Sequence, residues 1–200
     1  EKADLGIVVD PDVDRLAIID ENGEMFGEEY TLVAVADYLL KHKKGAAVSN
    51  LSSSRALRDV AEKHNSEYFA SAVGEVNVVT LMKEKNAVIG GEGNGGIIYP
   101  ELHYGRDSLV GTALFLTHLA KENKTVSELR TTYPAYFMGK KKIELTPEIN
   151  VDELLTKMEN LYQNEEISTV DGVKIDFPNS WVHFRKSNTE PIIRIYTEAK

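Results

Sequence analysis

The chain contains no cysteine among its 200 residues. A disulfide framework and a thiolate site for a metal or a nucleophile are therefore excluded. A protein without disulfides suits the reducing cytoplasm, which is where we expect it. Long apolar runs are also missing, because no stretch approaches the ~20 apolar residues that a membrane-spanning helix needs. We therefore expect no membrane partner.

Basic residues are fewer than acidic residues. Lysine and arginine together number 23 against 32 aspartates and glutamates, and the formal net charge is −9. Such a surface gives no general attraction to nucleic acid or to anionic membranes, so nucleic acid is not an expected partner. A binding site for an anion must instead be built locally, from a few well-placed basic groups. The length leaves room for one or two domains with a real core.

Apolar spacing divides the chain into three parts. Residues 5–9 and 16–19 predict two strands within the first part, 1–27. Strand and helix patterns alternate from 28 to 132, which predicts a mixed α/β layer domain. From 133 to 200 a helix is followed by short strands and turns, which predicts a smaller α+β domain. The fold class is therefore α/β, with a second, smaller α+β domain.

Three local details can be tested against a structure. The run at 5–9 is apolar and largely β-branched, which predicts a buried strand. Ser108 is expected to cap a long helix that continues to Lys121. Asn150 is expected to cap a helix whose inward face carries Leu154, Leu155, Met158 and Leu161.

The segment DPDVDR at 10–15 places carboxylates at alternate positions directly after a predicted strand. Asp10, Asp12 and Asp14 would repel one another unless a cation lies between them. Mg²⁺ prefers hard oxygen ligands, so we predict that these aspartates bind Mg²⁺. Arg15 adds a permanent cation that can hold a phosphoryl oxygen beside the metal.

Other interpretations of this segment exist. A solvated acidic turn would explain the charges without any function. Counted from Asp10, the carboxylate spacing resembles an EF-hand with Glu21 at its twelfth position, but Arg15 stands where that loop needs glycine. An Asp-x-Asp after a strand also resembles the nucleophile loop of haloacid-dehalogenase-type phosphatases, although the rest of that fold has no counterpart here. A Ca²⁺-binding module without catalysis therefore remains an alternative.

A second motif, GGEGNGG, occupies residues 90–96. Its glycines fit the dinucleotide fingerprint at face value, but the following IIYPEL is not helical, and no Gly-Lys-Ser/Thr follows as in a Walker loop. Glycines allow the backbone to approach a ligand closely, and the carboxylate of Glu92 can accept hydrogen bonds from vicinal hydroxyls. This combination predicts a sugar or polyol site, with a plain flexible turn as the alternative.

A third motif, RKSNTEPIIR, spans residues 185–194. Two guanidinium groups, hydroxyls, an amide and turn N–H groups would together form a phosphate pocket in an otherwise acidic domain. An ordinary β-turn with incidental arginines is the alternative. The predicted phosphate-binding residues are Arg185, Ser187, Asn188, Thr189 and Arg194.

The three motifs, in this order and at these separations, resemble the α-D-phosphohexomutase superfamily: phosphoglucomutases, phosphomannomutases and phosphoglucosamine mutases. The segments DLGIVVD, VSNLSSS and VGEVNV extend the resemblance over essentially the whole chain. The family has four domains, and this chain resembles a C-terminal part of it. The resemblance implies the end of domain 2 with the metal loop at 1–27, a sugar-binding domain 3 at 28–132, and a phosphate-binding domain 4 at 133–200 that is truncated at its C-terminus.

The resemblance also implies roles. Members transfer a phosphoryl group from a phosphoserine to a hexose phosphate, form a bisphosphate, and return the other phosphoryl group to the serine. By this resemblance Arg15 lies near the transferring phosphoryl group, and Mg²⁺ is the cofactor. The remaining implied residues are Asp10, Asp12 and Asp14 for the metal, Glu92 and Asn94 for the sugar, and Arg185, Ser187, Asn188, Thr189 and Arg194 for the phosphate that is not transferred.

Three departures from the family pattern matter. The phosphoserine loop does not occur in these 200 residues, so we expect the chain alone to be inactive and to depend on N-terminal domains of the same protein. Asn94 and Gly96 stand where the sugar loop usually has serine and histidine, and Ala72 stands where a basic residue is often found. The choice among glucose, mannose and glucosamine phosphates therefore stays open. A non-catalytic sugar-phosphate-binding module is the alternative function.

Overall fold

A computed structural model describes residues 2–146, 149–187 and 190–200. The chain forms two compact units, Glu1–Ala135 (unit 1) and Tyr136–Lys200 (unit 2). None of the helices in the described ranges is long and apolar enough to cross a membrane.

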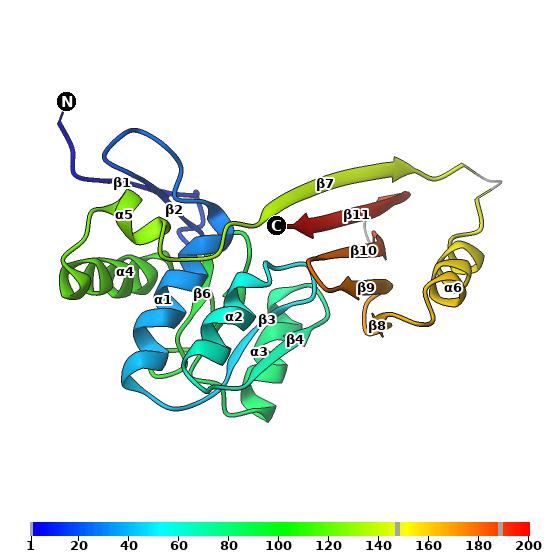
Figure 1. Cartoon of the computed structure of the whole chain (residues 1–200), viewed down its shortest axis with the longest axis horizontal. Coiled ribbons are helices and arrows are strands. Elements are labelled where there is room, and N and C mark those ends of the chain that lie inside the picture. Colours follow the sequence, from blue (N-terminus) through cyan, green and yellow to red (C-terminus); the bar gives the residue numbers. More distant parts are fainter. Residues whose placement is uncertain (1, 147–148, 188–189) are drawn as a thin grey trace. The chain divides into compact units, whose positions relative to one another are not determined.

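A four-stranded sheet lies at the centre of unit 1, in the order β4-β3-β5-β6. Figure 1 labels three of its strands, β3, β4 and β6. Its strands are β3 (Ala47–Asn50), β4 (Tyr68–Ser71), β5 (Ile89–Glu92) and β6 (Gly96–Ile98). The first three run parallel, and β6 pairs antiparallel with β5. This mixed sheet with helical crossovers is the α/β layer domain that the alternating pattern predicts, so that prediction is confirmed.

Helices cover both faces of this sheet. A β-carbon at Gly90 would meet the sulfur of Met82 on α3, whereas one at Gly91 would meet the Cδ1 atom of Leu32 on α1. Neighbouring residues in a strand point to opposite faces, so α3 and α1 lie on opposite sides of β5. The helices of the unit are α1 (Glu28–His42), α2 (Ala56–Lys63), α3 (Glu75–Glu84), α4 (Ser108–Glu122) and α5 (Val126–Arg130).

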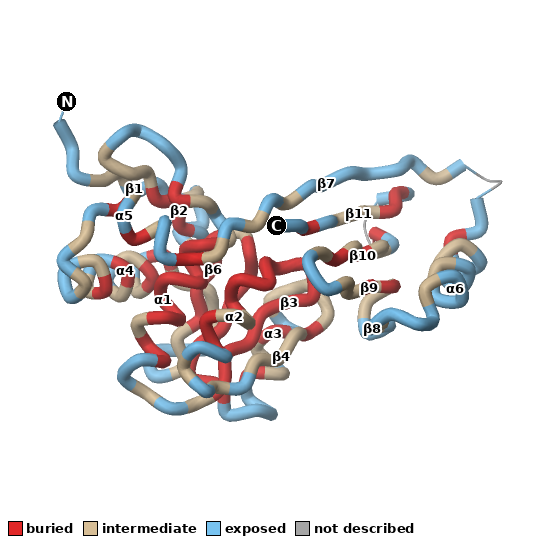
Figure 2. Tube along the Cα trace, in the orientation of Figure 1, coloured by how far each residue is buried: buried red, intermediate tan, exposed pale blue. Residues whose placement is uncertain are grey.

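The core of unit 1 follows from this layering. Between the sheet and α3, the buried side chains include Val48, Val78, Met82 and Ile98. Each of these four is fully shielded from solvent. Figure 2 colours the buried positions of the chain, β3 among them, red. Truncating such a side chain to alanine costs about 2–5 kcal/mol, so this packing is a main source of stability for unit 1.

The first two strands form a separate antiparallel hairpin, β1 (Gly6–Val9) and β2 (Leu16–Ile19). In β2 the side chains of Leu16 and Ile18 are buried. In β1 they are not: Val8 is 55% exposed, and the prediction of a buried strand at 5–9 is wrong for the described chain. An apolar run predicts a strand, but burial also needs a covering element, and within the described ranges β1 pairs only with β2.

The helix caps differ from the prediction at one of two places. Asp107, not Ser108, caps α4, because its carboxylate accepts the backbone N–H groups of Leu109 (2.8 Å) and Val110 (3.0 Å). Ser108 is the first residue of the helix, and its hydroxyl bonds elsewhere. The cap of α6 is as predicted, with Asn150 accepting from a backbone N–H in the first turn.

The described residues of unit 2 form an antiparallel sheet of five strands, in the order β7-β11-β10-β9-β8, and one helix. The indole Nε1 of buried Trp181 donates to the buried carboxylate of Glu198 at 2.8 Å, which satisfies both groups in the core. The sheet and the helix of unit 2 together confirm the predicted smaller α+β class. The elements are β7 (Phe137–Glu144), α6 (Val151–Leu161), β8 (Glu166–Ser168), β9 (Val173–Phe177), β10 (Ser180–Lys186) and β11 (Ile192–Ala199).

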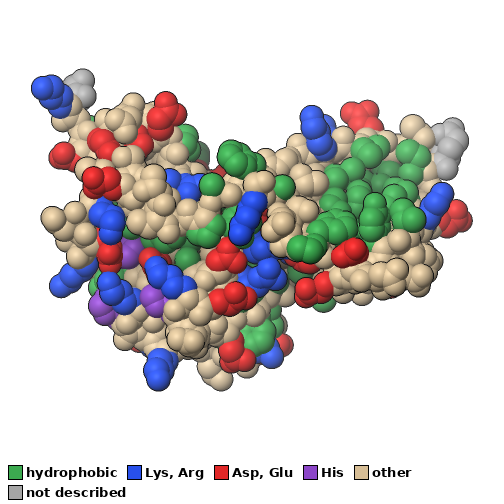
Figure 3. Space-filling model, viewed as in Figure 1, with side chains coloured by type: hydrophobic (Ala, Val, Ile, Leu, Met, Phe, Trp, Pro, Cys, Tyr) green, Lys and Arg blue, Asp and Glu red, His purple; other side chains and the backbone are tan. Residues whose placement is uncertain are grey.

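The helix of unit 2 is only partly covered. Val151 is its one buried residue, and Leu161 is 65% exposed, so the prediction that Leu161 faces inward is wrong. The helical spacing of the apolar residues does define one face of the helix. The described sheet does not cover the C-terminal end of that face, where Leu161 lies. Hydrophobic side chains also gather on the side of unit 2 seen in Figure 3.

Candidate active site

The sheet of unit 1 reverses its strand order between β3 and β5. The chain passes from β3 to β4 on one side, and then returns through α3 to β5 on the other side. In α/β sheets, ligands bind in the crevice outside the carboxyl ends of strands at such a point. The residues that end these two strands are Asn50 and Glu92.

Glu92 is held firmly at this position. Its Oε1 atom accepts the side-chain amide of Asn50 at 3.0 Å and the backbone N–H of Gly74 at 3.3 Å. Its Oε2 atom accepts Nη1 of Arg106 at 3.0 Å. A carboxylate has about four lone-pair sites, so one remains for a donor such as a ligand hydroxyl. The sugar-binding role of Glu92 stays a prediction, and Asn50 was not predicted as a site residue.

The loop of residues 10–15, here called the aspartate loop, contains backbone strain. Val13 has a φ of 59°, a left-handed conformation that is rare for a β-branched residue. Its carbonyl accepts both the hydroxyl of Ser108 (2.7 Å) and the backbone N–H of Ser108 (3.3 Å), and its own N–H bonds to Asp10. Strain of this kind costs about 1–3 kcal/mol and concentrates at functional sites.

Asp10 organises the turn of this loop. Its Oδ1 atom accepts the backbone N–H groups of Asp14 (3.1 Å) and Arg15 (3.2 Å). Desolvation raises the pKa of Asp10, but these N–H groups and the Arg15 charge lower it by more, so the net pKa lies below its usual value. Asp10 is therefore an anion at neutral pH. Asp12 is exposed on the same loop.

Asp14 has a different environment. Its Oδ2 atom lies 2.5 Å from Nη2 of Arg106. Its Oδ1 atom is buried and receives no hydrogen bond from the described residues, and the nearest cation is Nε of Arg15 at 3.8 Å. Burial, followed by the neighbouring Asp10 carboxylate, raises the pKa of Asp14 against the opposing effect of Arg106.

Arg106 connects the two loops, and sequence reasoning missed it. Its guanidinium contacts Asp14, Glu92 (3.0 Å) and Glu75 (3.0 Å), and its side chain is only 14% exposed. No motif contains it, because all three partners are distant in sequence. The one available signal was that Arg106 is the only arginine between Arg58 and Arg130 in an acidic chain.

The group formed by these residues carries excess negative charge. We call it the Arg106 cluster: Arg15 and Arg106 with the four carboxylates that they contact, Asp10, Asp14, Glu75 and Glu92. Four formal negative charges therefore face two guanidinium groups. Arg15 is the more accessible of the two, since half of its side chain is exposed.

This arrangement fits a divalent cation. The charge excess equals that of one divalent ion, and the orphan oxygen of Asp14 is a hard ligand of the kind that Mg²⁺ prefers. Among the described residues, however, no three acidic or histidine side chains converge as a ready-made metal site. Asp10, Asp12 and Asp14 as metal ligands therefore stay a prediction, and Arg106 currently occupies one oxygen of Asp14.

The glycine loop of residues 90–96 is joined directly to the aspartate loop. The backbone N–H of Leu16, next to the aspartate loop, donates to the carbonyl of Gly95 at 3.0 Å. Asn94 turns back onto its own loop, where its Oδ1 atom accepts the N–H of Gly96 at 3.2 Å. The structure thus brings the predicted metal and sugar loops together within unit 1.

The two predicted phosphate-binding arginines of unit 2 lie on neighbouring strands. Arg185 belongs to β10 and Arg194 to β11, and the register places them directly opposite each other. Like charges in this position repel, and each arginine is held by its own carboxylate: Arg185 by Asp171 (3.6 Å) and Arg194 by Glu190 (2.6 Å). An anion between the two guanidiniums would relieve the repulsion.

The turn of the hairpin that β10 and β11 form is closed by Ser187. Its backbone N–H donates to the carbonyl of Ile192 at 3.0 Å, and its hydroxyl oxygen accepts the N–H of Glu190 at 3.3 Å. Asn188 and Thr189 lie outside the described residues. The phosphate-binding role of this loop stays a prediction.

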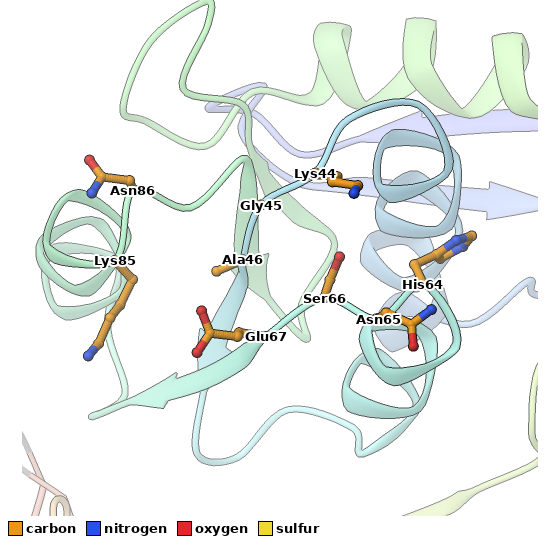
Figure 4. A pocket seen from close by; sticks show the side chains of 9 residues that line it. All are labelled: Lys44, Gly45, Ala46, His64, Asn65, Ser66, Glu67, Lys85 and Asn86. Atoms are coloured by element: carbon orange, nitrogen blue, oxygen red, sulfur yellow. The ribbon is translucent and has the colours of Figure 1, made fainter.

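A cavity of about 370 Å³ lies at the opposite edge of the unit 1 sheet (Figure 4). Its lining residues come from the segments that precede β3, β4 and β5, and none is a predicted site residue. We place the site at the carboxyl ends instead, because the strained loop, the orphan carboxylate oxygen and the strand-order reversal all lie there.

These features define unit 1 as an α/β/α layer domain with a cluster of charged side chains at the switch point of its sheet. The family model described as phosphoglucomutase/phosphomannomutase, alpha/beta/alpha domain III, matches residues 27–136. The model of the C-terminal domain of the same family matches residues 142–200. The chain belongs to the phosphoglucomutase/phosphomannomutase family.

Relatives and solved structures agree. A phosphoglucomutase/phosphomannomutase of Thermococcus kodakarensis is 38% identical over 99% of this chain and 44% of its own length. A phosphoglucosamine/phosphogalactosamine mutase of Sulfurisphaera tokodaii is 36% identical over 100% of this chain and 45% of its own. A solved structure titled as a putative phosphomannomutase from Thermus thermophilus is 26% identical, with a TM-score of 0.74 over 98% of this chain and 42% of that one. The chain thus spans less than half the length of these relatives.

Proposed function

We propose that this chain is the C-terminal part of a phosphohexomutase that interconverts 1-phospho and 6-phospho aldohexoses. The substrates would be phosphates of glucose, mannose or glucosamine, and the reaction would proceed through a phosphoserine and a bisphosphate intermediate. One observation carries the proposal: Arg106 contacts Asp14 and Glu92, so the predicted metal loop and the predicted sugar loop meet in one cluster. The names of the relatives, all mutases of hexose phosphates, support it.

The roles follow from charge and position. Asp10, Asp12 and Asp14 would hold Mg²⁺, which when bound neutralises charge on a phosphoryl oxygen. Arg15, half exposed at the edge of the cluster, would bind an oxygen of the transferring phosphoryl group. The remaining lone pair of Glu92 would accept a sugar hydroxyl, and Asn94 would contribute a neighbouring polar group.

Unit 2 would hold the phosphate group that is not transferred. Arg185 and Arg194 lie opposite each other in the register, and a dianion between them would be bound by charge-assisted hydrogen bonds. Ser187, together with Asn188 and Thr189, would add donors from the turn. This division of labour leaves the nucleophile to a part of the protein outside these 200 residues.

A comparison of two proteins tests the proposal. The complete protein with its preceding domains should convert glucose 1-phosphate, mannose 1-phosphate or glucosamine 6-phosphate in the presence of Mg²⁺. The 200-residue chain should convert none of them, because positioning cannot replace a missing nucleophile. Turnover by the 200-residue chain, or no turnover of any of the three by the complete protein, would contradict the proposal. Tight Ca²⁺ binding without turnover would favour the binding-module alternative.

A further inference from the structure

The side chain of Arg106 contacts both the aspartate loop and the glycine loop of unit 1. Its Nη2 atom contacts Asp14, its Nη1 atom contacts Glu92, and its Nε atom faces Glu75 at 3.0 Å. Its backbone N–H also donates to Glu75, at 3.3 Å, which fixes the base of the side chain. A guanidinium has five N–H donors in a rigid fork, so a shift at one carboxylate changes its geometry at the others.

The glycine loop is shaped around this side chain. A β-carbon at Gly96 would overlap the Cδ atom of Arg106 and come within 3.0 Å of its Cγ atom. Gly96 has an ordinary negative φ, so its missing side chain serves space and not conformation. The path of Arg106 between the loops therefore depends on glycine at position 96.

We propose that Arg106 is a positioning residue that transmits occupancy of the metal loop to Glu92. The inference rests on the proposed function, because it takes the aspartate loop as the metal site. An ion on the orphan Oδ1 atom of Asp14 draws negative charge away from the Oδ2 atom that Arg106 contacts. When the ion binds, the contact between Arg106 and Asp14 weakens, and Arg106 shifts toward Glu75 and Glu92.

The change then reaches the sugar loop through Glu92. Its Oε2 atom follows Arg106, and its Oε1 atom carries the Asn50 amide and the Gly74 N–H. Metal binding thus resets the carboxylate that is proposed to accept a sugar hydroxyl. The loop is prepared for substrate only when the metal loop is filled.

Nitrogen–proton NMR spectra of the chain titrated with Mg²⁺ alone test this coupling. In the native chain, signals of residues 10–15 should shift, and those of Gly74, the glycine loop and the Asn50 side-chain amide should shift at the same Mg²⁺ concentrations. In Arg106→Gln the first group should still shift, and the second should lose most of its response. Arg15→Gln is the matched control, because it removes a charge beside Asp14 without touching Glu92.

The Mg²⁺ affinities of the variants distinguish the effect of a lost charge from the effect of lost positioning. Both Gln variants should bind Mg²⁺ about three- to tenfold more tightly, because each removes a positive charge near the metal. Only Arg106→Gln should uncouple the loops. Arg106→Lys should restore the native affinity but not the coupling, since an ammonium lacks the rigid fork that holds separate carboxylates in fixed positions. Gly96→Ala, which keeps the charge and displaces the side chain, should also uncouple them.

The outcomes are distinct. If Mg²⁺ shifts the aspartate loop and the Glu92 partners equally in native chain and Arg106→Gln, the inference is wrong while the metal site stands. If Mg²⁺ shifts no signal of residues 10–15 in the native chain, the proposed metal site is wrong, and the inference falls with it. If Arg106→Gln does not fold, Gly96→Ala and Arg106→Lys decide between coupling and none.

Discussion

Unit 1 contains two charged clusters of opposite construction. The Arg106 cluster places guanidiniums among a larger number of carboxylates. The other, here called the Asp37 cluster, places one carboxylate among donors from four residues. Asp37 on α1 contacts Lys63 (3.1 Å), His64 (2.6 Å), Tyr133 (3.2 Å) and His118 (3.5 Å).

The difference between them is charge balance. In the Asp37 cluster the single carboxylate forms an ion pair with Lys63 and accepts further hydrogen bonds, so its negative charge is balanced inside the fold. In the Arg106 cluster the carboxylates outnumber their arginines, and one buried oxygen of Asp14 has no donor among the described residues. A matched cluster stabilises the fold, whereas an unmatched one keeps capacity for an external cation. The following predictions test that contrast.

The largest effect should come from Asp37→Asn. Removing this mostly buried charge breaks charge-assisted hydrogen bonds and leaves its partners unmatched, at a cost of about 2–4 kcal/mol of unfolding free energy. Urea unfolding at pH 7 measures it. Lys63→Gln is the control, because that partner is largely exposed and its loss should cost less than about 1 kcal/mol.

The effect of Asp37→Asn should depend on pH in a defined direction. Burial raises the pKa of Asp37, but hydrogen bonds from His118, His64 and Lys63 lower it by more, so the folded pKa lies below the unfolded value of 3.8. The stabilisation is therefore complete above the unfolded pKa and is lost as pH falls through the folded pKa. The stability advantage of the native chain over the variant should therefore shrink as pH falls below 3.8. An advantage that persists undiminished at the lowest pH where the chain still folds would contradict the assignment.

A smaller effect, on phosphate binding, is expected at the hairpin of unit 2. Its charge pattern is opposite to that of the Arg106 cluster, because two cations lie opposite each other. Arg185→Ala should weaken binding of inorganic phosphate about ten- to a hundredfold, the value of one charge-assisted bidentate contact. NMR titration measures it at Ser187. Arg185→Lys should recover only part of the loss.

The control for this hairpin is Lys186→Ala. Lys186 follows Arg185 in β10, so its side chain points to the other face of the strand. It should change phosphate affinity by less than about twofold, through long-range charge alone. Equal losses in both variants would show that phosphate responds to net charge and not to a built pocket.

Sequence reasoning predicted the features that depend on neighbours along the chain. The strands, the layered unit and the smaller sheet follow from apolar periodicity, which is local. Asp10 was found because alternating carboxylates follow a predicted strand, and Glu92 was found because it is a carboxylate among glycines. In the structure Asp10 organises its turn and Glu92 ends β5 at the switch point.

What could not be predicted depends on contacts between distant segments. Arg106 lies in no motif, and its partners come from three other parts of the chain. Asp107 and Ser108 are both good capping residues, and the carbonyl of Val13 decides which one caps. The exposure of β1 was missed because an apolar run looks the same whether or not anything covers it.

The smallest change in stability should come from Asp14→Asn, the counterpart of Asp37→Asn in the unmatched cluster. Arg106 keeps Glu75 and Glu92, and an asparagine oxygen can still accept from its guanidinium. Burial raises the pKa of Asp14, so at neutral pH its ionised form opposes folding, an effect that sets in as pH rises through 3.8. The unfolding free energy at pH 7 should therefore change by less than about 1 kcal/mol in either direction.

Added Mg²⁺ should show a role of Asp14 that unfolding experiments without metal do not show. Millimolar Mg²⁺ should raise the melting temperature of the native chain, because a ligand that binds only the folded state stabilises it. The same addition should leave Asp14→Asn unchanged, since the variant lacks one hard ligand and part of the charge excess. A loss above about 2 kcal/mol without metal would instead make Asp14 a structural anion like Asp37, and the contrast between the two clusters would be wrong. The near-neutral result would mean that the charge at Asp14 is kept for binding and not for folding.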